Sequence, residues 1–203
     1  MELQGIKADL HRYLQAGREA LLWKLEGLSE YDVRRPMTPT GTNLLGVVKH
    51  VASVESGYLG DCFGRPFGEP LPWFAEDAEP NADLWVTPGE SRAGIIAMYH
   101  RVWVHSDATI AALDLEAVGH VPWWPEGRSQ VTLHQLLIHM IAETHRHAGQ
   151  MDIVRESIDG AAGLRAENDN LNSGDSEDSD AWWAAYRARL EDAARAADAA
   201  GKG

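Results

Sequence analysis

The sequence contains a single cysteine, Cys62, which excludes a disulfide within the chain. Proteins of oxidising compartments commonly use disulfides, so this scarcity favours a reducing setting such as the cytoplasm. Near Cys62 along the chain, the only cation that could favour a thiolate is Arg65. We therefore expect Cys62 to be a buried or half-buried thiol without a chemical role.

Long hydrophobic runs are also missing. No stretch of about 18 consecutive apolar residues occurs, although a membrane-spanning helix needs that length. The first residues, MELQGIKADLHRYL, are polar and amphipathic rather than signal-like. We therefore expect neither membrane insertion nor export, and we expect a cytoplasmic protein.

Positive charge is scarce as well. The chain has 18 Lys and Arg against 31 Asp and Glu, which gives a formal net charge of −13. Such a chain would repel a phosphate backbone or an anionic membrane surface, so neither nucleic acid nor a membrane is an expected partner. A small anionic ligand is not excluded, because a metal ion can reverse the local field inside a pocket.

No segment shows the strict alternation of apolar and polar residues that marks a strand of convincing length. Apolar residues recur instead at helical spacing in four segments: residues 2–28, 43–60, 89–115 and 131–159. Thr42 or Asn43 can cap the second helix, and Thr132 can cap the fourth. Four amphipathic helices predict an all-α protein that is built as a four-helix bundle.

The remaining segments divide the chain into a body and a C-terminal extension. Three segments with clusters of Gly or Pro are expected to be connections without regular structure: residues 31–42, 61–88 and 116–130. The second is a long loop between the second and third helices. The composition then predicts a bundle over residues 1–160, an acidic linker over 161–180, and an alanine-rich helix and tail over 181–203.

The helix predicted over residues 131–159 carries three side chains that can bind a metal: His139, Glu143 and His147. Each step of four residues turns about 40° around the axis, so all three share one face with the apolar stripe. A carboxylate and two imidazoles on a buried face are costly unless something pairs with them. A divalent metal would do so, with His50 of the second helix as a further ligand.

The spacing alone does not decide which residues would bind. A catalytic zinc takes three protein ligands and keeps one open position, so His50 needs one of two pairs, His139/Glu143 or Glu143/His147. His145 lies on a different face and is expected to be exposed. Glu55 follows His50 by five residues, about 140° away around the helix, and is not an expected ligand.

Two segments resemble the signature segments of the DinB-like superfamily: TNLLGVVKHVASVESGYLGDCFGRPF and LLIHMIAETHRHAGQMDIVRESIDG. More narrowly, they are similar to the actinobacterial branch related to the mini-circle protein and to mycothiol-dependent maleylpyruvate isomerase. The resemblance spans about residues 5–160. It implies a four-helix bundle of the DinB/YfiT-like type, with helices that run up, down, down and up.

The resemblance also implies a ligand set, His50, Glu143 and His147, in which Glu143 stands where many members have histidine. His139 then lies one turn earlier and either supports a ligand or packs. Gln150 is a departure, because the closer relatives frequently have histidine there. That change alters the surroundings of the site without removing a ligand.

The implied chemistry is thiol transfer, with a small-molecule substrate and a low-molecular-weight thiol such as mycothiol or bacillithiol as co-substrate. Zinc is the expected metal and nickel also fits, since imidazole and carboxylate serve several first-row metals. Two alternatives stay open: a non-catalytic metal-binding bundle that acts in stress response or dimerisation, and a metal-dependent hydrolase. The resemblance also allows a homodimer formed through bundle helices.

Overall fold

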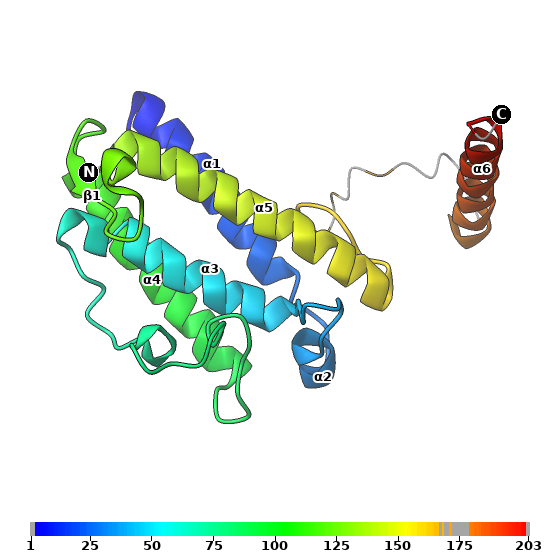
Figure 1. Cartoon of the computed structure of the whole chain (residues 1–203), viewed down its shortest axis with the longest axis horizontal. Helices are drawn as coiled ribbons and strands as arrows, with labels where there is room; N and C mark the ends of the chain where they lie inside the picture. The colour runs from blue at the N-terminus through cyan, green and yellow to red at the C-terminus, as the bar shows by residue number, and fades with distance from the viewer. Residues whose placement is uncertain (1–2, 167, 169–170, 172–178, 202–203) are drawn as a thin grey trace. The chain divides into compact units, whose positions relative to one another are not determined.

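The computed structural model describes residues 3–166, 168, 171 and 179–201. The chain divides into two compact units, residues 1–169 and 170–203, and each is described by itself. The helices of the first unit are α1 (Gly5–Trp23), α2 (Glu30–Arg34), α3 (Leu44–Tyr58), α4 (Arg92–Ala112) and α5 (Leu133–Asp159) (Figure 1). Among the described residues, no helix combines the length and apolar character needed to cross a membrane.

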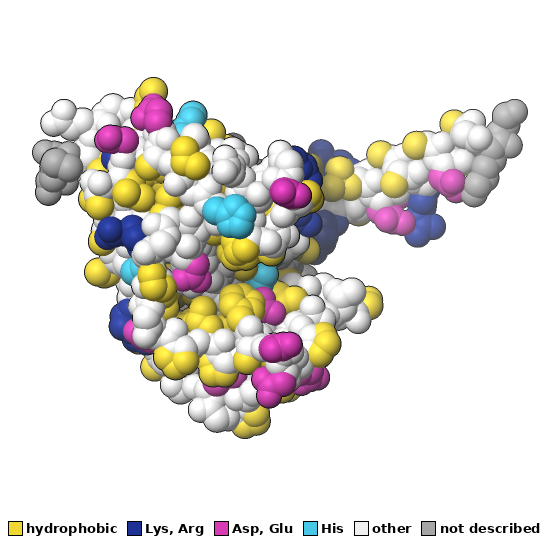
Figure 2. All heavy atoms as spheres, turned by 60° about the vertical axis from the view of Figure 1, so that its left-hand side comes forward, with side chains coloured by type: hydrophobic (Ala, Val, Ile, Leu, Met, Phe, Trp, Pro, Cys, Tyr) yellow, Lys and Arg dark blue, Asp and Glu magenta, His cyan; other side chains and the backbone are white. Residues whose placement is uncertain are grey.

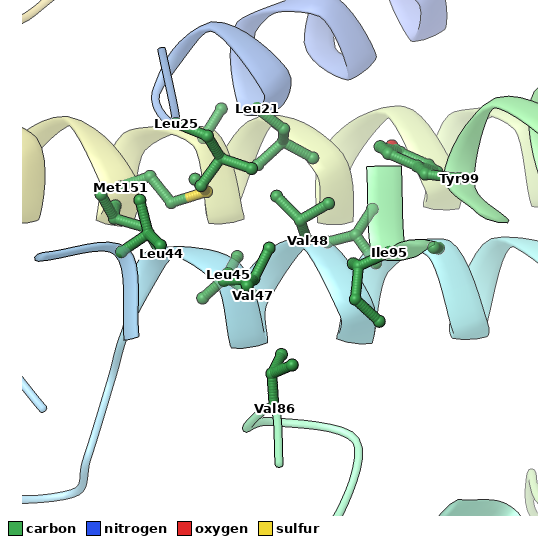
Figure 3. Packing of buried hydrophobic residues seen from close by; sticks show 14 of the residues in the cluster. Leu21, Leu25, Leu44, Leu45, Val47, Val48, Val86, Ile95, Tyr99 and Met151 are labelled. Atoms are coloured by element: carbon green, nitrogen blue, oxygen red, sulfur yellow. The ribbon is translucent and has the colours of Figure 1, made fainter. Parts of the chain in front are cut away.

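The main hydrophobic core is made by the four long helices, α1, α3, α4 and α5 (Figure 3). Each contributes aliphatic or aromatic side chains that are almost fully buried, and burial of one such side chain contributes about 1.5–3 kcal/mol. The all-α class predicted from the helical spacing is therefore confirmed. The core residues labelled in Figure 3 are Leu21, Leu25, Leu44, Leu45, Val47, Val48, Val86, Ile95, Tyr99 and Met151.

Helices α1 and α5 pack side by side and run in the same direction. Gly17 of α1 faces Thr144 of α5, and further along both helices Lys24 forms an ion pair with Asp152 at 2.5 Å. A Cβ on Gly17 would lie 2.9 Å from Cγ2 of Thr144, so glycine permits the close approach. This contact holds the first helix against the one that carries two of the predicted ligands.

Helix α3 runs opposite to α5 and lies next to it (Figure 1). The ring of His50 lies beside that of His147, and two turns later the ring of Tyr58 lies beside that of His139. Asn43 caps α3 by accepting a hydrogen bond from Gly46 N at 2.7 Å. The antiparallel packing thus aligns His50 with the C-terminal half of α5.

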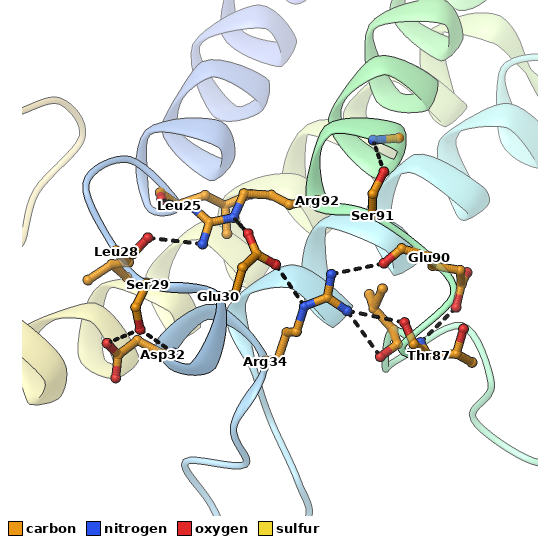
Figure 4. A network of polar contacts seen from close by, with 12 residues as sticks. Leu25, Leu28, Ser29, Glu30, Asp32, Arg34, Thr87, Glu90, Ser91 and Arg92 are labelled. Carbon is orange, nitrogen blue, oxygen red and sulfur yellow. Dashed lines mark hydrogen bonds and ion pairs between the residues drawn. The ribbon is translucent and has the colours of Figure 1, made fainter.

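Short helix α2 corrects the expectation that residues 31–42 are an irregular connection. Arg34 donates to the backbone carbonyls of Thr87 and Glu90, and Arg92 pairs with Glu30 at 2.7 Å and donates to Leu28 O (Figure 4). These contacts join α2 to the segment that enters α4. A five-residue helix is too short to show a helical period in the sequence, so tertiary contacts decide its conformation.

A second correction concerns residues 116–130, which were expected to be a loop without strands. They contain β1 (Val118–His120) and the first residue of β2 (Gln130–Thr132), whose other two residues lie in the segment predicted as the fourth helix. The two strands pair antiparallel, with Gly119 opposite Val131. A Cβ on Gly119 would lie 2.7 Å from Cε1 of Phe63, so this hairpin packs closely on the turn after α3. Strands of three residues are too short for alternation to reveal them.

The long loop between α3 and α4 contains only two short 3₁₀ turns, Asp61–Phe63 and Pro72–Phe74, as its many Gly and Pro residues predict. Its last part crosses the N-terminal half of α3. A Cβ on Gly46 would lie 1.9 Å from the backbone oxygen of Leu84, so the loop backbone rests directly on the helix there. This approach fixes residues 82–86 relative to α3.

We expect Gly46→Ala to destabilise the protein by about 1–3 kcal/mol, because the added methyl group must push backbone atoms of Leu84 away. Gly149→Ala is the matched control. Gly149 is also helical, its Cβ would meet nothing within 4 Å, and alanine there should add up to about 1 kcal/mol. Denaturant unfolding of both variants measures the difference, and equal midpoints would contradict the close contact.

The second unit contains α6 (Ser179–Ala200), on which Trp182 and Tyr186 stack with ring centroids 5.2 Å apart. Much of the predicted acidic linker lies outside the described residues, so it stays a prediction. Of its first residues, Leu164 packs against the main core and Gly163 N donates to Asp152.

Candidate functional site

His50 lies in the middle of α3, and its side chain is 21% exposed. Its Nδ1 atom is 2.6 Å from Oδ2 of Asp83, which belongs to the long loop and is itself mostly buried. A carboxylate accepts hydrogen bonds, so Nδ1 carries the proton in this contact. In the neutral imidazole the lone pair is then on Nε2, and this is the form that binds a metal.

His147 is arranged in a similar way on α5. Its Nδ1 atom is 2.9 Å from Oε1 of Gln150, one turn later, and its Nε2 atom is 3.7 Å from Oε2 of Glu143, one turn earlier. Burial, and secondarily the charge of His50, lower the pKa of His147 below its ordinary value. His147 is thus favoured as a neutral imidazole, as a metal ligand must be.

The two histidines meet across the α3–α5 contact, with ring centroids 5.0 Å apart. The structure therefore brings His50 next to His147, and His147 next to Glu143. With the side chains as they lie, however, no set of three His, Cys, Asp or Glu residues in the described part of the chain could hold a metal ion. The three residues are neighbours in pairs rather than an assembled metal centre.

The burial expected for the ligand face is also incomplete. The side chain of His147 is 14% exposed and that of Glu143 is 32% exposed, so the glutamate lies at the edge of the buried face of α5. Ile153, an apolar residue further along the same helix, is 66% exposed. A strict 3.6-residue period does not give the width of the buried stripe, which depends on the neighbouring helices.

His139 is separated from this group by its aromatic contacts. Its ring lies 4.7 Å from that of Tyr58 and 5.1 Å from that of Trp124, in edge-to-face arrangements. Both Trp123 and Trp124 donate their indole N–H to the hydroxyl of Tyr58 at 3.1 Å. His139 therefore packs in an aromatic cluster with Tyr58 and Trp124.

The sequence leads us to expect His145 to be exposed and Glu55 not to be a ligand. His145 is not exposed, since it is half-buried against α1 with Nε2 3.0 Å from Tyr13 O. Glu55 is fully buried and forms an ion pair with Arg18 at 2.6 Å, so it is not available as a ligand.

Asp83 is the residue that sequence reasoning missed. It lies 33 residues after His50, in a loop whose Gly and Pro content hides any periodic signal. Only the crossing of this loop over α3 reveals the pairing. Figure 2 shows a recess on one face of the molecule, in which hydrophobic side chains lie beside a histidine and acidic side chains.

Cys62 is expected to react slowly with alkylating reagents in the native protein. Its side chain is buried, and burial followed by the charge of Asp61 raises the pKa of the thiol to about 11. At pH 8 only about one thiol in a thousand would be ionised, and the thiolate is the reactive form. Iodoacetamide labelling should be slow when native and fast in urea, and rapid native labelling would contradict this environment.

Comparison with known proteins gives the family of this chain. The family model described as mycothiol S-transferase matches residues 9–160. Among curated proteins, no sequence matches the chain. The matched region runs from the first turns of α1 to the end of α5, and it contains every residue of the candidate site. Because the match covers most of the sequence, this chain belongs to the mycothiol S-transferase family.

Proposed function

We propose that this protein is a metal-dependent S-transferase, which joins a low-molecular-weight thiol such as mycothiol to a small electrophile. The proposed metal ligands are His50, Glu143 and His147. Membership of the mycothiol S-transferase family supports the thiol and the reaction class. The contacts of these three residues support the ligand set.

The donor set fits a first-row metal such as zinc. On both histidines the Nδ1 atom is hydrogen-bonded to an acceptor, which is Asp83 for His50 and Gln150 for His147. In the neutral rings, both Nε2 atoms can then give a lone pair to a metal. The two rings lie 5.0 Å apart between centroids, and the Glu143 carboxylate is close to one of them. Because Glu143 is 32% exposed, its carboxylate has room to rotate toward a shared ion.

Three protein ligands would leave one coordination position open. When bound there, a divalent metal would lower the pKa of a thiol, so that the thiolate is present at neutral pH. Two neutral imidazoles and one carboxylate would leave the zinc site with a net positive charge, and this charge would attract the thiolate. Cys62 is not needed, because its buried thiol is not ionised.

The observation that carries the proposal is the pairing of two imidazoles across α3 and α5, each with Nδ1 already engaged. The test is the metal content of the purified protein beside that of the double variant His50→Ala, His147→Ala. We expect about one zinc or nickel per wild-type chain and none in the double variant. His134→Ala is the matched control, because His134 is an exposed histidine of the same helix.

Turnover then separates the reaction classes. A transferase requires both the thiol and an electrophile, and its rate rises with thiol concentration. A hydrolase would use a metal-bound hydroxide, and its rate would not depend on added thiol. If the wild type retains no more metal than the double variant does, the metal-dependent proposal fails.

A further inference from the structure

We propose that Asp83 is a positioning residue, which fixes the tautomer and the orientation of His50 so that Nε2 faces the metal. This inference rests on the proposed function for the identity of the ligand that His50 binds. It assigns a role to a residue of the long loop, outside the three ligands. The contact itself, the anchoring of the loop and the contrast with Gln150 support it.

The contact is short and shielded. Oδ2 of Asp83 lies 2.6 Å from Nδ1 of His50, and the side chains are 15% and 21% exposed. An ionised carboxylate has no proton to donate, so the bond requires the proton on Nδ1. A carboxylate behind a ligating histidine fixes the ring and makes its other nitrogen a stronger donor.

Buried contacts anchor the loop on both sides of Asp83. Lys49, which is 2% exposed, donates to Ala82 O at 2.9 Å and to Trp85 O at 3.0 Å. Asn43 donates to Leu84 O at 3.1 Å. Both anchoring side chains belong to α3 or its cap, the same element that carries His50. The carboxylate is therefore held in a fixed position relative to the imidazole.

Lys49 is buried and charged, so its ammonium group would be costly to leave unpaired. Glu90 forms an ion pair with Lys49 at 2.8 Å. Burial opposes the ionised form of Glu90, yet hydrogen bonds from Lys49 and Thr87 hold the pKa of Glu90 below its ordinary value. The loop thus ends in an ion pair with the same lysine that binds its carbonyls at Ala82 and Trp85.

Gln150 makes the corresponding contact to His147 but differs in charge and burial. It is exposed, and its amide oxygen is neutral. Charge-assisted hydrogen bonds are roughly twice as strong as neutral ones, and exposure to water weakens the latter further. We therefore expect Asp83 to contribute more to metal binding than Gln150 does.

The test compares Asp83→Ala with Asp83→Asn, which keeps an acceptor oxygen but loses the charge, and with Gln150→Ala. Asp77→Asn is the matched control, because Asp77 is an exposed aspartate of the same loop. Zn²⁺ affinity is measured by competition with a chromophoric chelator. We expect a loss of about 10–100-fold for Asp83→Ala, a smaller loss for Asp83→Asn and Gln150→Ala, and no change for the control.

A second readout does not depend on the metal. In the metal-free protein, long-range ¹H–¹⁵N spectra of the neutral His50 ring should show the proton on Nδ1 in the wild type and a mixture of the Nδ1–H and Nε2–H tautomers in Asp83→Ala. Unchanged spectra together with Zn²⁺ affinity within about twofold of the wild type would overturn the inference. If the wild type binds no Zn²⁺, the proposed function fails, and the ring spectra still decide whether Asp83 sets the tautomer.

Discussion

His147→Ala is expected to remove both the bound metal and the thiol transfer, with kcat/KM lower by about three orders of magnitude or more. Of the three proposed ligands, His147 is the one that contacts both of the others, Glu143 at 3.7 Å and the ring of His50. Its loss leaves two donors on separate helices. Activation of a nucleophile by a metal is worth several kcal/mol, and each 1.4 kcal/mol is about a tenfold change in rate.

The measurement is metal content by elemental analysis, followed by kcat/KM with the thiol and an electrophile at saturating added zinc. Glu143→His is the informative partner variant, because imidazole is also a metal ligand at this position one turn before His147. We expect Glu143→His to retain metal, and Glu143→Ala to lose it. Full turnover by metal-free His147→Ala would show that the transfer does not need the site.

The residues of the candidate site were predictable to different degrees, for physical reasons. Glu143 and His147 share a helix, so their spacing alone places them on one face. The pairing of His50 with them joins two helices: the sequence offered His50 as a candidate further ligand, and the resemblance to a known family implied the set of three. Asp83 could not be predicted, because its position follows from the contacts of Lys49 and Asn43 with loop carbonyls.

For the fold, the length of each element decided whether the sequence could predict it. The four long helices were predicted because each repeats its apolar period over several turns, and the caps Asn43 and Thr132 were correct. Helix α2 and the β1–β2 hairpin were missed, because elements of three to five residues carry too few positions to establish a period. Their structure is decided by partners distant in sequence, such as Arg34 with Thr87.

A buried ion pair between α1 and α3 is expected to have a large effect on the stability of the protein. Arg18 contacts Glu55 through two hydrogen bonds, of 2.6 Å and 3.2 Å, and both side chains are fully buried. Burial alone would lower the pKa of Arg18, but the charge and hydrogen bonds of Glu55 more than offset it and hold that pKa above its ordinary value.

Arg18→Met is expected to destabilise the protein by about 3–5 kcal/mol, because it leaves the Glu55 carboxylate buried without a partner. At about 2–4 °C per kcal/mol, the melting temperature should fall by about 6–20 °C. Arg12→Met is the matched control: Arg12 pairs with Asp9, but both side chains are about two thirds exposed, so a change within about 0.5 kcal/mol is expected.

The double variant Arg18→Met, Glu55→Leu separates the cost of an unpaired charge from the value of the pair. A well-packed apolar replacement of a buried ion pair is often neutral or stabilising, so the double variant should recover most of the stability lost in Arg18→Met. Asp107, which also pairs with Arg18 at 2.9 Å, keeps His11 as a partner at 2.9 Å in both variants. If the two losses simply added, the cost would lie in lost packing between α1 and α3 rather than in an isolated carboxylate, because independent sites add and coupled ones do not.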